Sequence, residues 1–124
     1  MLKQIRFLTL FIVVALIVSS CESNDEAVKV VYKISDNQSG FTVNYRNSGG
    51  ELQSEQVMPL SKEDEWKHSF VSEEGEIVYV SAIYDDVNTG IKVQILLDGK
   101  VYKQASSLYD TLSFVTVSGS IPYE

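Results

Sequence analysis

Few residues of this chain could perform nucleophilic or acid–base chemistry. Its 124 residues include one histidine, His68, and one cysteine, Cys21. A nucleophile needs a base within hydrogen-bond reach, and a zinc site needs three or four converging histidine, cysteine or carboxylate ligands. His68 shares one side of an extended segment with Trp66 and Phe70, which predicts a partly buried strand histidine with one hydrogen-bond partner. We therefore expect a protein that is not an enzyme and binds no cofactor.

Three acidic clusters could bring carboxylates together, at residues 63–65, 73–76 and 85–90. The first two flank a predicted strand and are typical of solvated turns that keep a domain soluble. The third, Asp-Asp-Val-Asn-Thr-Gly, matches half of a calcium-binding loop. The complete loop needs a bidentate glutamate at its twelfth position, and that position is Leu97. A β-turn explains the same residues, so we predict no metal site.

The N-terminus carries an apolar run at residues 7–18. A membrane-spanning helix needs about 20 apolar residues, whereas the central region of a secretory signal has about 7–15. Lys3 and Arg6 supply the positive charge that precedes such a region. The tetrad Val-Ser-Ser-Cys that ends at Cys21 resembles the lipobox of bacterial lipoproteins. The resemblance implies removal of the signal before Cys21 and acylation of that cysteine, and several acyl chains together anchor a protein stably. The alternative is an uncleaved signal anchor with Cys21 unmodified.

Residues 21–27, Cys-Glu-Ser-Asn-Asp-Glu-Ala, are polar and acidic and predict a short flexible tether. Acidic residues after a lipidated cysteine resemble a surface-export signal of some Gram-negative lineages. In other lineages an acidic second residue, here Glu22, retains the lipoprotein at the inner membrane. We expect a lipid-anchored protein of the cell envelope, at the outer membrane or cell surface in preference to the inner membrane.

Removal of the signal peptide, residues 1–20, leaves a chain of the size of one ordinary domain. Because Lys3 and Arg6 leave with it, 8 basic residues stand against 17 acidic ones, a net charge of −9. Binding to phosphate backbones depends on clustered Lys and Arg, so we expect no nucleic-acid partner. Anionic headgroups are equally unfavourable, so the lipid alone should hold the protein to its membrane.

The remaining sequence alternates apolar and polar residues with period two, the pattern of half-buried antiparallel strands. Turn residues separate the segments, and Asp98-Gly99 suits a type I′ hairpin with positive φ at both positions. The pattern predicts an all-β fold, a single β-sandwich of about seven antiparallel strands over residues 28–122, immunoglobulin-like in general architecture. The alternating segments are residues 28–34, 41–45, 66–70, 77–84, 91–97, 101–105 and 111–117.

Several segments occur in a recognisable order: Phe-Thr-Val-Asn-Tyr at 41–45, a polar corner at 57–70, Val-Tyr-Val-Ser-Ala-Ile-Tyr at 78–84, an Asp-Gly-Lys hairpin within 90–107, and Phe-Val-Thr-Val-Ser-Gly-Ser at 114–120. This order resembles the MmpS family of small mycobacterial membrane proteins over about residues 28–119. The resemblance implies a sandwich outside the inner membrane that assists an exporter of the resistance-nodulation-division type.

The sequence departs from the MmpS pattern in three respects. Family members usually keep an uncleaved membrane helix, where this chain has a lipobox. The corner tryptophan expected after Pro59 is missing, and Leu60 and Ser61 stand there. Many members also carry a cysteine pair bridging two late strands, and the alignment places Val93 and Val115 at these positions. If it holds, the Cβ atoms of the two valines should lie within about 4–6 Å.

The predicted strand at residues 77–84 is apolar on both faces, and only one face of a two-layer sandwich can enter the core. We expect Tyr79 and Ile83 on the opposite face to continue onto Leu96 and Tyr102 of the following hairpin, as a partner surface. The alternative is a central strand whose outer side is covered by a loop. The favoured function is a lipid-anchored binding or accessory module that contacts a membrane transporter or other envelope protein. A surface-exposed structural or adhesion sandwich is the second hypothesis.

Overall fold

A computed structural model of the chain describes residues 27–86, 89–108 and 114–123. The predicted signal peptide, Cys21 and nearly all of the tether lie outside this range. None of the described segments is a helix long and apolar enough to cross a membrane. The structure contains strands β1 (Ala27–Ser35), β2 (Phe41–Arg46), β3 (Leu52–Val57), β4 (Trp66–Glu73), β5 (Ile77–Ile83), β6 (Gly90–Leu97), β7 (Lys100–Leu108) and β8 (Phe114–Ser120).

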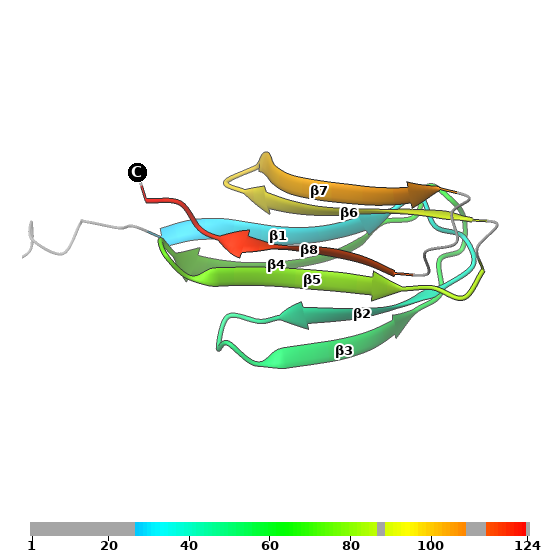
Figure 1. The fold of residues 1–124 in the computed structure, drawn as a ribbon, viewed down its shortest axis with the longest axis horizontal. Coiled ribbons are helices and arrows are strands. Elements are labelled where there is room, and N and C mark those ends of the chain that lie inside the picture. Colours follow the sequence, from blue (N-terminus) through cyan, green and yellow to red (C-terminus); the bar gives the residue numbers. More distant parts are fainter. Residues whose placement is uncertain (1–26, 87–88, 109–113, 124) are drawn as a thin grey trace, which may run out of the picture.

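The strands form two four-stranded antiparallel sheets that pack face to face (Figure 1). Sheet A has the order β4-β1-β6-β7, and sheet B has the order β3-β2-β5-β8. The predicted all-β class and the predicted single β-sandwich are therefore confirmed. The strand that the prediction missed is β3, whose sequence Leu-Gln-Ser-Glu-Gln-Val has no apolar alternation because it is an exposed edge strand.

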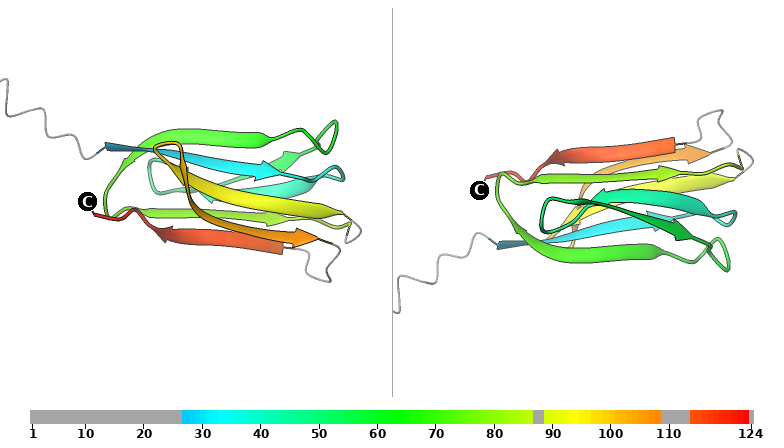
Figure 2. Two further views of the ribbon diagram at one scale, coloured as in Figure 1. Left: turned by 90° about the horizontal axis from the view of Figure 1, so that it is seen from above. Right: turned by 90° about the horizontal axis from the view of Figure 1, so that it is seen from below.

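The sandwich has two ends that differ in their connections (Figures 1 and 2). At one end of the sandwich, β1 begins close to the ends of β4 and β6, since Ala27 pairs with Glu73 and Val30 pairs with Leu97. We call this the proximal end, because the chain from Cys21 arrives there. The distal end is the opposite one, where the loops at 36–40 and 58–65 and residues 84–86 lie.

The core follows from the period-two pattern, because alternate side chains of a strand point to one face of its sheet. The central strands of the two sheets supply most of it, including Tyr32 from β1, Val80 from β5 and Val93 from β6, all fully buried. The predicted hairpin turn is confirmed: Asp98 and Gly99 both have positive φ, 50° and 83°. Leu97 and Lys100 pair on either side of that turn.

A buried tyrosine joins the two sheets near the proximal end. The hydroxyl of Tyr32, in sheet A, donates to the Arg46 carbonyl oxygen at 2.8 Å and accepts from the Tyr79 N–H at 3.2 Å, both in sheet B. Burial raises the pKa of Tyr32 above its ordinary value of 10.0, although the Tyr79 N–H and the Arg46 charge oppose the shift. Tyr32 therefore satisfies two backbone groups and fixes one sheet against the other.

Candidate functional site

The structure separates the four residues predicted as a partner surface. Tyr79 and Ile83 lie on the outer face of sheet B, since Val80 and Ala82 between them are in the core. Leu96 lies on the outer face of sheet A, beside Val31 and Val101. Because β5 and β6 belong to different sheets, the expected continuous surface from Ile83 to Leu96 does not exist.

Tyr102 does not face outward with Leu96 either. The register of β6 and β7 shifts between Ile95, which pairs with Lys103, and Leu96, which pairs with Val101, so Tyr102 is the extra residue of a β-bulge. Its ring packs against the core, and its hydroxyl donates to the Ser120 carbonyl oxygen at 2.8 Å. Tyr102 follows Val101, the partner of outward-facing Leu96, so it lies on the inward side and closes the edge between β7 and β8. Of the predicted set, only Tyr79 and Ile83 share a face.

His68 lies in a cluster of aromatic rings on the inward side of edge strand β4, as its alternation with Trp66 and Phe70 predicted. Its ring lies 4.5 Å from that of Tyr45, centroid to centroid, and 5.7 Å from that of Phe70. Burial raises the pKa of Tyr45, and the neighbouring Glu55 carboxylate raises it further. The ring contacts explain His68 as a packing residue.

The acidic clusters have individual structural partners. The Asp64 carboxylate accepts from the Leu60 N–H at 2.7 Å, and the Glu65 carboxylate contacts the Lys33 ammonium at 2.8 Å. The hydrogen bond from Lys33 lowers the pKa of Glu65. The Asp86 carbonyl oxygen accepts from the Thr89 N–H and hydroxyl, a turn like that expected at 85–90. Within the described ranges, no three His, Cys, Asp or Glu side chains gather as metal ligands.

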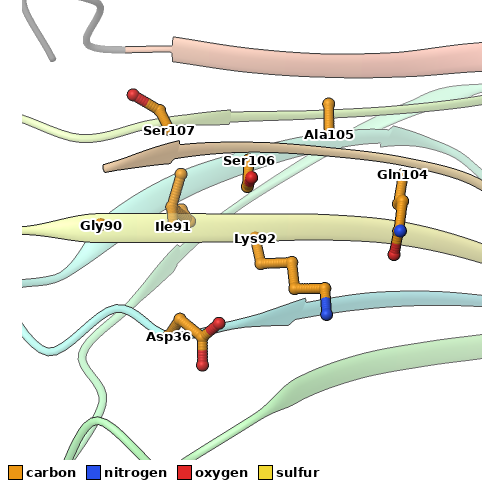
Figure 3. A pocket seen from close by; sticks show the side chains of 8 residues that line it. All are labelled: Asp36, Gly90, Ile91, Lys92, Gln104, Ala105, Ser106 and Ser107. Carbon is orange, nitrogen blue, oxygen red and sulfur yellow. The ribbon is translucent and has the colours of Figure 1, made fainter. Parts of the chain in front are cut away.

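A shallow hollow of about 460 Å³ lies on β6 and β7 at the distal part of sheet A. Figure 3 shows Lys92 extending from β6 over the neighbouring strand β1, with Asp36 to one side and Ser107 pointing the other way from Ser106 and Gln104 of β7. The Gln104 amide oxygen accepts from the Gln94 amide at 2.8 Å. Ammonium, amide and hydroxyl groups of this kind suit a polar anionic ligand.

A second hollow, of about 260 Å³, lies at the distal end of sheet B. We call it the distal pocket. Strands β2, β3 and β5 and the segments that follow β3 and β5 supply its walls. Phe41 and Val57, which pair on β2 and β3, are among its apolar lining residues. The lining residues are Ser39, Gly40, Phe41, Thr42, Gln56, Val57, Met58, Ile83, Tyr84, Asp85 and Asp86.

Four exposed apolar side chains lie at this end: Leu60, Met58, Phe114 and Ile83, with 96%, 77%, 55% and 46% of their surface exposed. Met58 and Ile83 line the distal pocket, and Ile83 pairs directly with Phe114 on the adjacent strand. We call Met58, Ile83 and Phe114 the distal apolar patch. Sequence reasoning identified only Ile83 of this set. Met58 lies in a loop without periodicity, and the pairing that brings Phe114 beside Ile83 depends on strand order.

The distal pocket is acidic at its rim. Asp85 and Asp86 line it, and its lining includes no lysine or arginine. Its wall is also positioned by hydrogen bonds: the buried Asn37 amide donates to the Gly90 carbonyl oxygen at 3.0 Å, and its oxygen accepts from the Gly40 N–H at 2.9 Å. Gly40 has φ of 101°, and a Cβ there would lie 2.7 Å from the Met58 sulfur. Gly40 therefore permits Met58 to pack closely over the loop.

Comparison with family models and with curated proteins does not assign the chain to a family. No family model matches the chain, and no curated protein matches it. The resemblance to the MmpS family thus rests on the ordered motifs alone. Val93 and Val115 both lie in the core, from β6 of sheet A and β8 of sheet B, two strands that contact each other across the sandwich. Their predicted separation of about 4–6 Å stays a prediction.

Proposed function

We propose that this protein is a lipid-anchored, non-enzymatic binding module of the cell envelope, which docks a partner such as a membrane transporter or another envelope protein. The observation that carries the proposal is the distal apolar patch, in which Met58 and Ile83 line a pocket and Phe114 pairs with Ile83 on the adjacent strand. Contiguous exposed apolar area rimmed by polar residues marks interaction sites in soluble domains. Methionine suits such a surface because its flexible thioether adapts to a partner.

The position of the anchor supports this assignment. β1 begins at Ala27, six residues after Cys21, and an extended chain spans at most about 3.6 Å per residue. A lipid on Cys21 would hold the proximal end within roughly 20 Å of the membrane. The distal end, where the patch lies, would then face away from the membrane and toward a partner.

The anchor is tested by Cys21→Ser in cells fed a clickable fatty acid. Labelling of the wild-type protein and loss of label in the variant are expected, with uncleaved precursor or soluble protein accumulating. Label that persists in the Cys21→Ser variant would contradict the lipoprotein assignment.

The docking surface is tested by Ile83→Glu, with Val101→Glu as the matched control. Val101 has 50% of its surface exposed, close to the value for Ile83, but lies on β7 of the other sheet. After mild crosslinking in native membranes, Ile83→Glu should lose the partners that wild-type protein recovers, whereas Val101→Glu should keep them. Both variants should melt close to the wild-type temperature. Equal recovery by both variants would remove the patch from the proposal.

A second candidate is a surface sandwich that adheres to an acidic matrix polysaccharide. The outer face of sheet A favours it, because Lys33 and Lys67 pair directly across β1 and β4, and Lys92 lies on neighbouring β6. Like charges placed opposite each other destabilise a sheet; the Glu65 carboxylate offsets Lys33, and an anionic ligand would add a partner for Lys67 and Lys92. Retention on immobilised polygalacturonate that falls with salt and with Lys67→Gln would favour this candidate. Absence of retention would remove it.

A further inference from the structure

We infer that the distal pocket receives an apolar side chain from a positively charged, amphipathic peptide segment of the partner, with Asp85 and Asp86 facing the cations of that segment. This inference rests on the proposed docking function and specifies the chemistry of the partner. Its basis is one pocket whose lining combines Phe41 and Val57, the exposed apolar side chains of Met58 and Ile83, and two aspartates.

The size of the pocket argues for a peptide side chain. Small-molecule sites usually have volumes of about 300–1,000 Å³ and bury most of their ligand. The distal pocket has about 260 Å³, and two of its lining residues, Met58 and Ile83, are exposed. A site of this size accommodates one or two side chains, while the rest of the segment lies on the exposed apolar side chains beside it. Phe41 and Val57 add apolar surface to the lining.

The charge around the pocket selects a basic segment. The distal loops within the described ranges carry one lysine, Lys62, among several carboxylates. Among them, Glu65 contacts Lys33 and Asp64 accepts from the Leu60 N–H. Electrostatic complementarity steers association and rejects like-charged partners. The carboxylates are Asp36, Glu63, Asp64, Glu65, Asp85 and Asp86.

The same charge disfavours other occupants. An anionic lipid surface would be repelled by Asp85 and Asp86, and the anchor places the proximal end, at the opposite side of the sandwich, nearest the membrane. A second copy of this chain, seated patch to patch, would bring the two acidic rims together in a symmetric interface. Like-charge contacts of this kind are costly. A basic segment is not repelled by Asp85 and Asp86, and it brings no second acidic rim into the interface.

The test uses the mature lipoprotein in nanodiscs of neutral phosphatidylcholine, with empty nanodiscs as background. The probe is a fluorescent 12-residue peptide that alternates leucine and lysine and carries one photoreactive leucine. Two comparison peptides replace lysine by glutamate or leucine by serine. Anisotropy gives the affinity, and mass spectrometry of the photoproduct locates the contact. Crosslinks on the segments around Met58 and Ile83 are expected from the leucine–lysine peptide alone.

Two pairs of variants separate the apolar and the charged contributions. Ile83→Ser should weaken binding about ten-fold, because a desolvated apolar anchor is lost, and Val101→Ser should leave the affinity unchanged. Asp85→Asn/Asp86→Asn should weaken binding about ten-fold at low salt. Glu73→Gln/Glu74→Gln, at the proximal end, removes the same net charge and should have little effect. Met58→Ser, at a mostly exposed position, provides a second apolar test should Ile83→Ser impair folding.

The outcomes decide between the two levels of the proposal. Equal binding of the leucine–glutamate peptide, or an equal loss in both charge variants, would overturn the basic-segment inference and leave the docking function standing. Crosslinks spread over other faces, or binding unaffected by Ile83→Ser and Met58→Ser, would overturn the assignment to this pocket. Binding that depends on both Ile83 and the Asp85–Asp86 pair would establish the inference.

Discussion

Two apolar regions of the sandwich differ in burial: Ile121 at the proximal end and the distal apolar patch, although the proximal end also carries exposed Leu52, Val71 and Ile77. At the proximal end, Ile121 follows β8 and is almost completely buried, and its backbone exchanges hydrogen bonds with Gly75 and Glu76 at 2.8 and 2.9 Å. The Arg46 guanidinium also donates to the Ile77 carbonyl oxygen at 2.6 Å. At the distal end, the apolar side chains of Met58, Ile83 and Phe114 remain outside the core.

The difference does not come from looser backbone structure at the distal end. Its loops are hydrogen-bonded as well, through Asn37 to Gly40 and Gly90 and through the Ser39 and Thr89 hydroxyls at 3.1 Å. Ordered loops that still present apolar side chains to water contribute little to folding through those side chains. Ile121 should therefore stabilise the fold, whereas Met58, Ile83 and Phe114 should contribute little to it and remain available for binding.

Among the substitutions that test this comparison, Ile121→Ala should have the largest effect on the free energy of unfolding. Ile121→Ala removes a buried side chain and leaves a cavity beneath the last residues of the chain, at a cost of about 2–5 kcal/mol in the free energy of unfolding. Urea denaturation followed by tryptophan fluorescence measures it, with Trp66 as the reporter. A cost below about 1 kcal/mol would show that the C-terminal residues are not part of the cooperative core.

A smaller loss is expected from Tyr32→Phe, which leaves the Arg46 carbonyl oxygen and the Tyr79 N–H without their shared partner. Partly buried groups that lose a hydrogen bond cost about 1–3 kcal/mol. Because burial raises the pKa of Tyr32, its neutral form is favoured in the folded state. This contribution is fully present below pH 10 and is lost as the pH rises through the folded-state pKa.

Stability curves measured between pH 8 and pH 11 check that part of the prediction. Wild-type protein should lose stability above pH 10, and Tyr32→Phe should lose it less steeply. Tyr45 also has a raised pKa, so some alkaline loss should remain in the variant. Identical slopes for the two proteins would show that Tyr32 ionises equally in the folded and unfolded states.

The sequence predicts the two-layer β-sandwich better than it predicts which exposed side chains share a surface, and the reason is physical. Alternation identifies which side of a strand is apolar, as for Trp66, His68 and Phe70, and an Asp-Gly pair identifies its own hairpin. Alternation does not tell which sheet a strand joins. The prediction therefore placed Ile83 and Leu96 on one surface, whereas they lie on opposite outer faces.

The remaining errors have local causes. Tyr102 faces inward because it follows Val101, which pairs with outward-facing Leu96; pairing outward from the Asp98-Gly99 turn indicates this side, and the prediction did not apply it. Edge strand β3 was not predicted because both of its faces are exposed, so its sequence does not alternate between apolar and polar residues. The distal pocket forms from segments far apart in the chain, around Gly40, Met58 and Ile83, so no local pattern of residues predicts it.

A further, more modest effect is expected at Asn37, which fixes the distal loop. Asn37→Ala removes the hydrogen bonds to Gly90 and Gly40, and we expect a cost of about 1 kcal/mol, since water can reach the half-buried Gly40. The variant should also weaken binding at the distal pocket, because Gly40 positions Met58. Urea denaturation and the leucine–lysine peptide measure the two effects. Full binding with reduced stability would show that the loop does not shape the pocket.

The smallest expected effect is on the exposed apolar residues themselves, and it completes the comparison with Ile121. Met58→Ser and Leu60→Ser should each change the free energy of unfolding by no more than about 0.5 kcal/mol, as surface substitutions usually do, because most of both side chains is exposed in the folded protein. Met58→Ser should nevertheless reduce partner recovery, whereas Leu60→Ser, outside the pocket lining, should reduce it less. Urea midpoints and crosslinking yields from the same preparations check both statements. A cost above about 1 kcal/mol for Met58→Ser would mean that its packing over Gly40 serves folding. Met58 would then stabilise the fold as Ile121 does, and the contrast between Ile121 and the distal apolar patch would not hold.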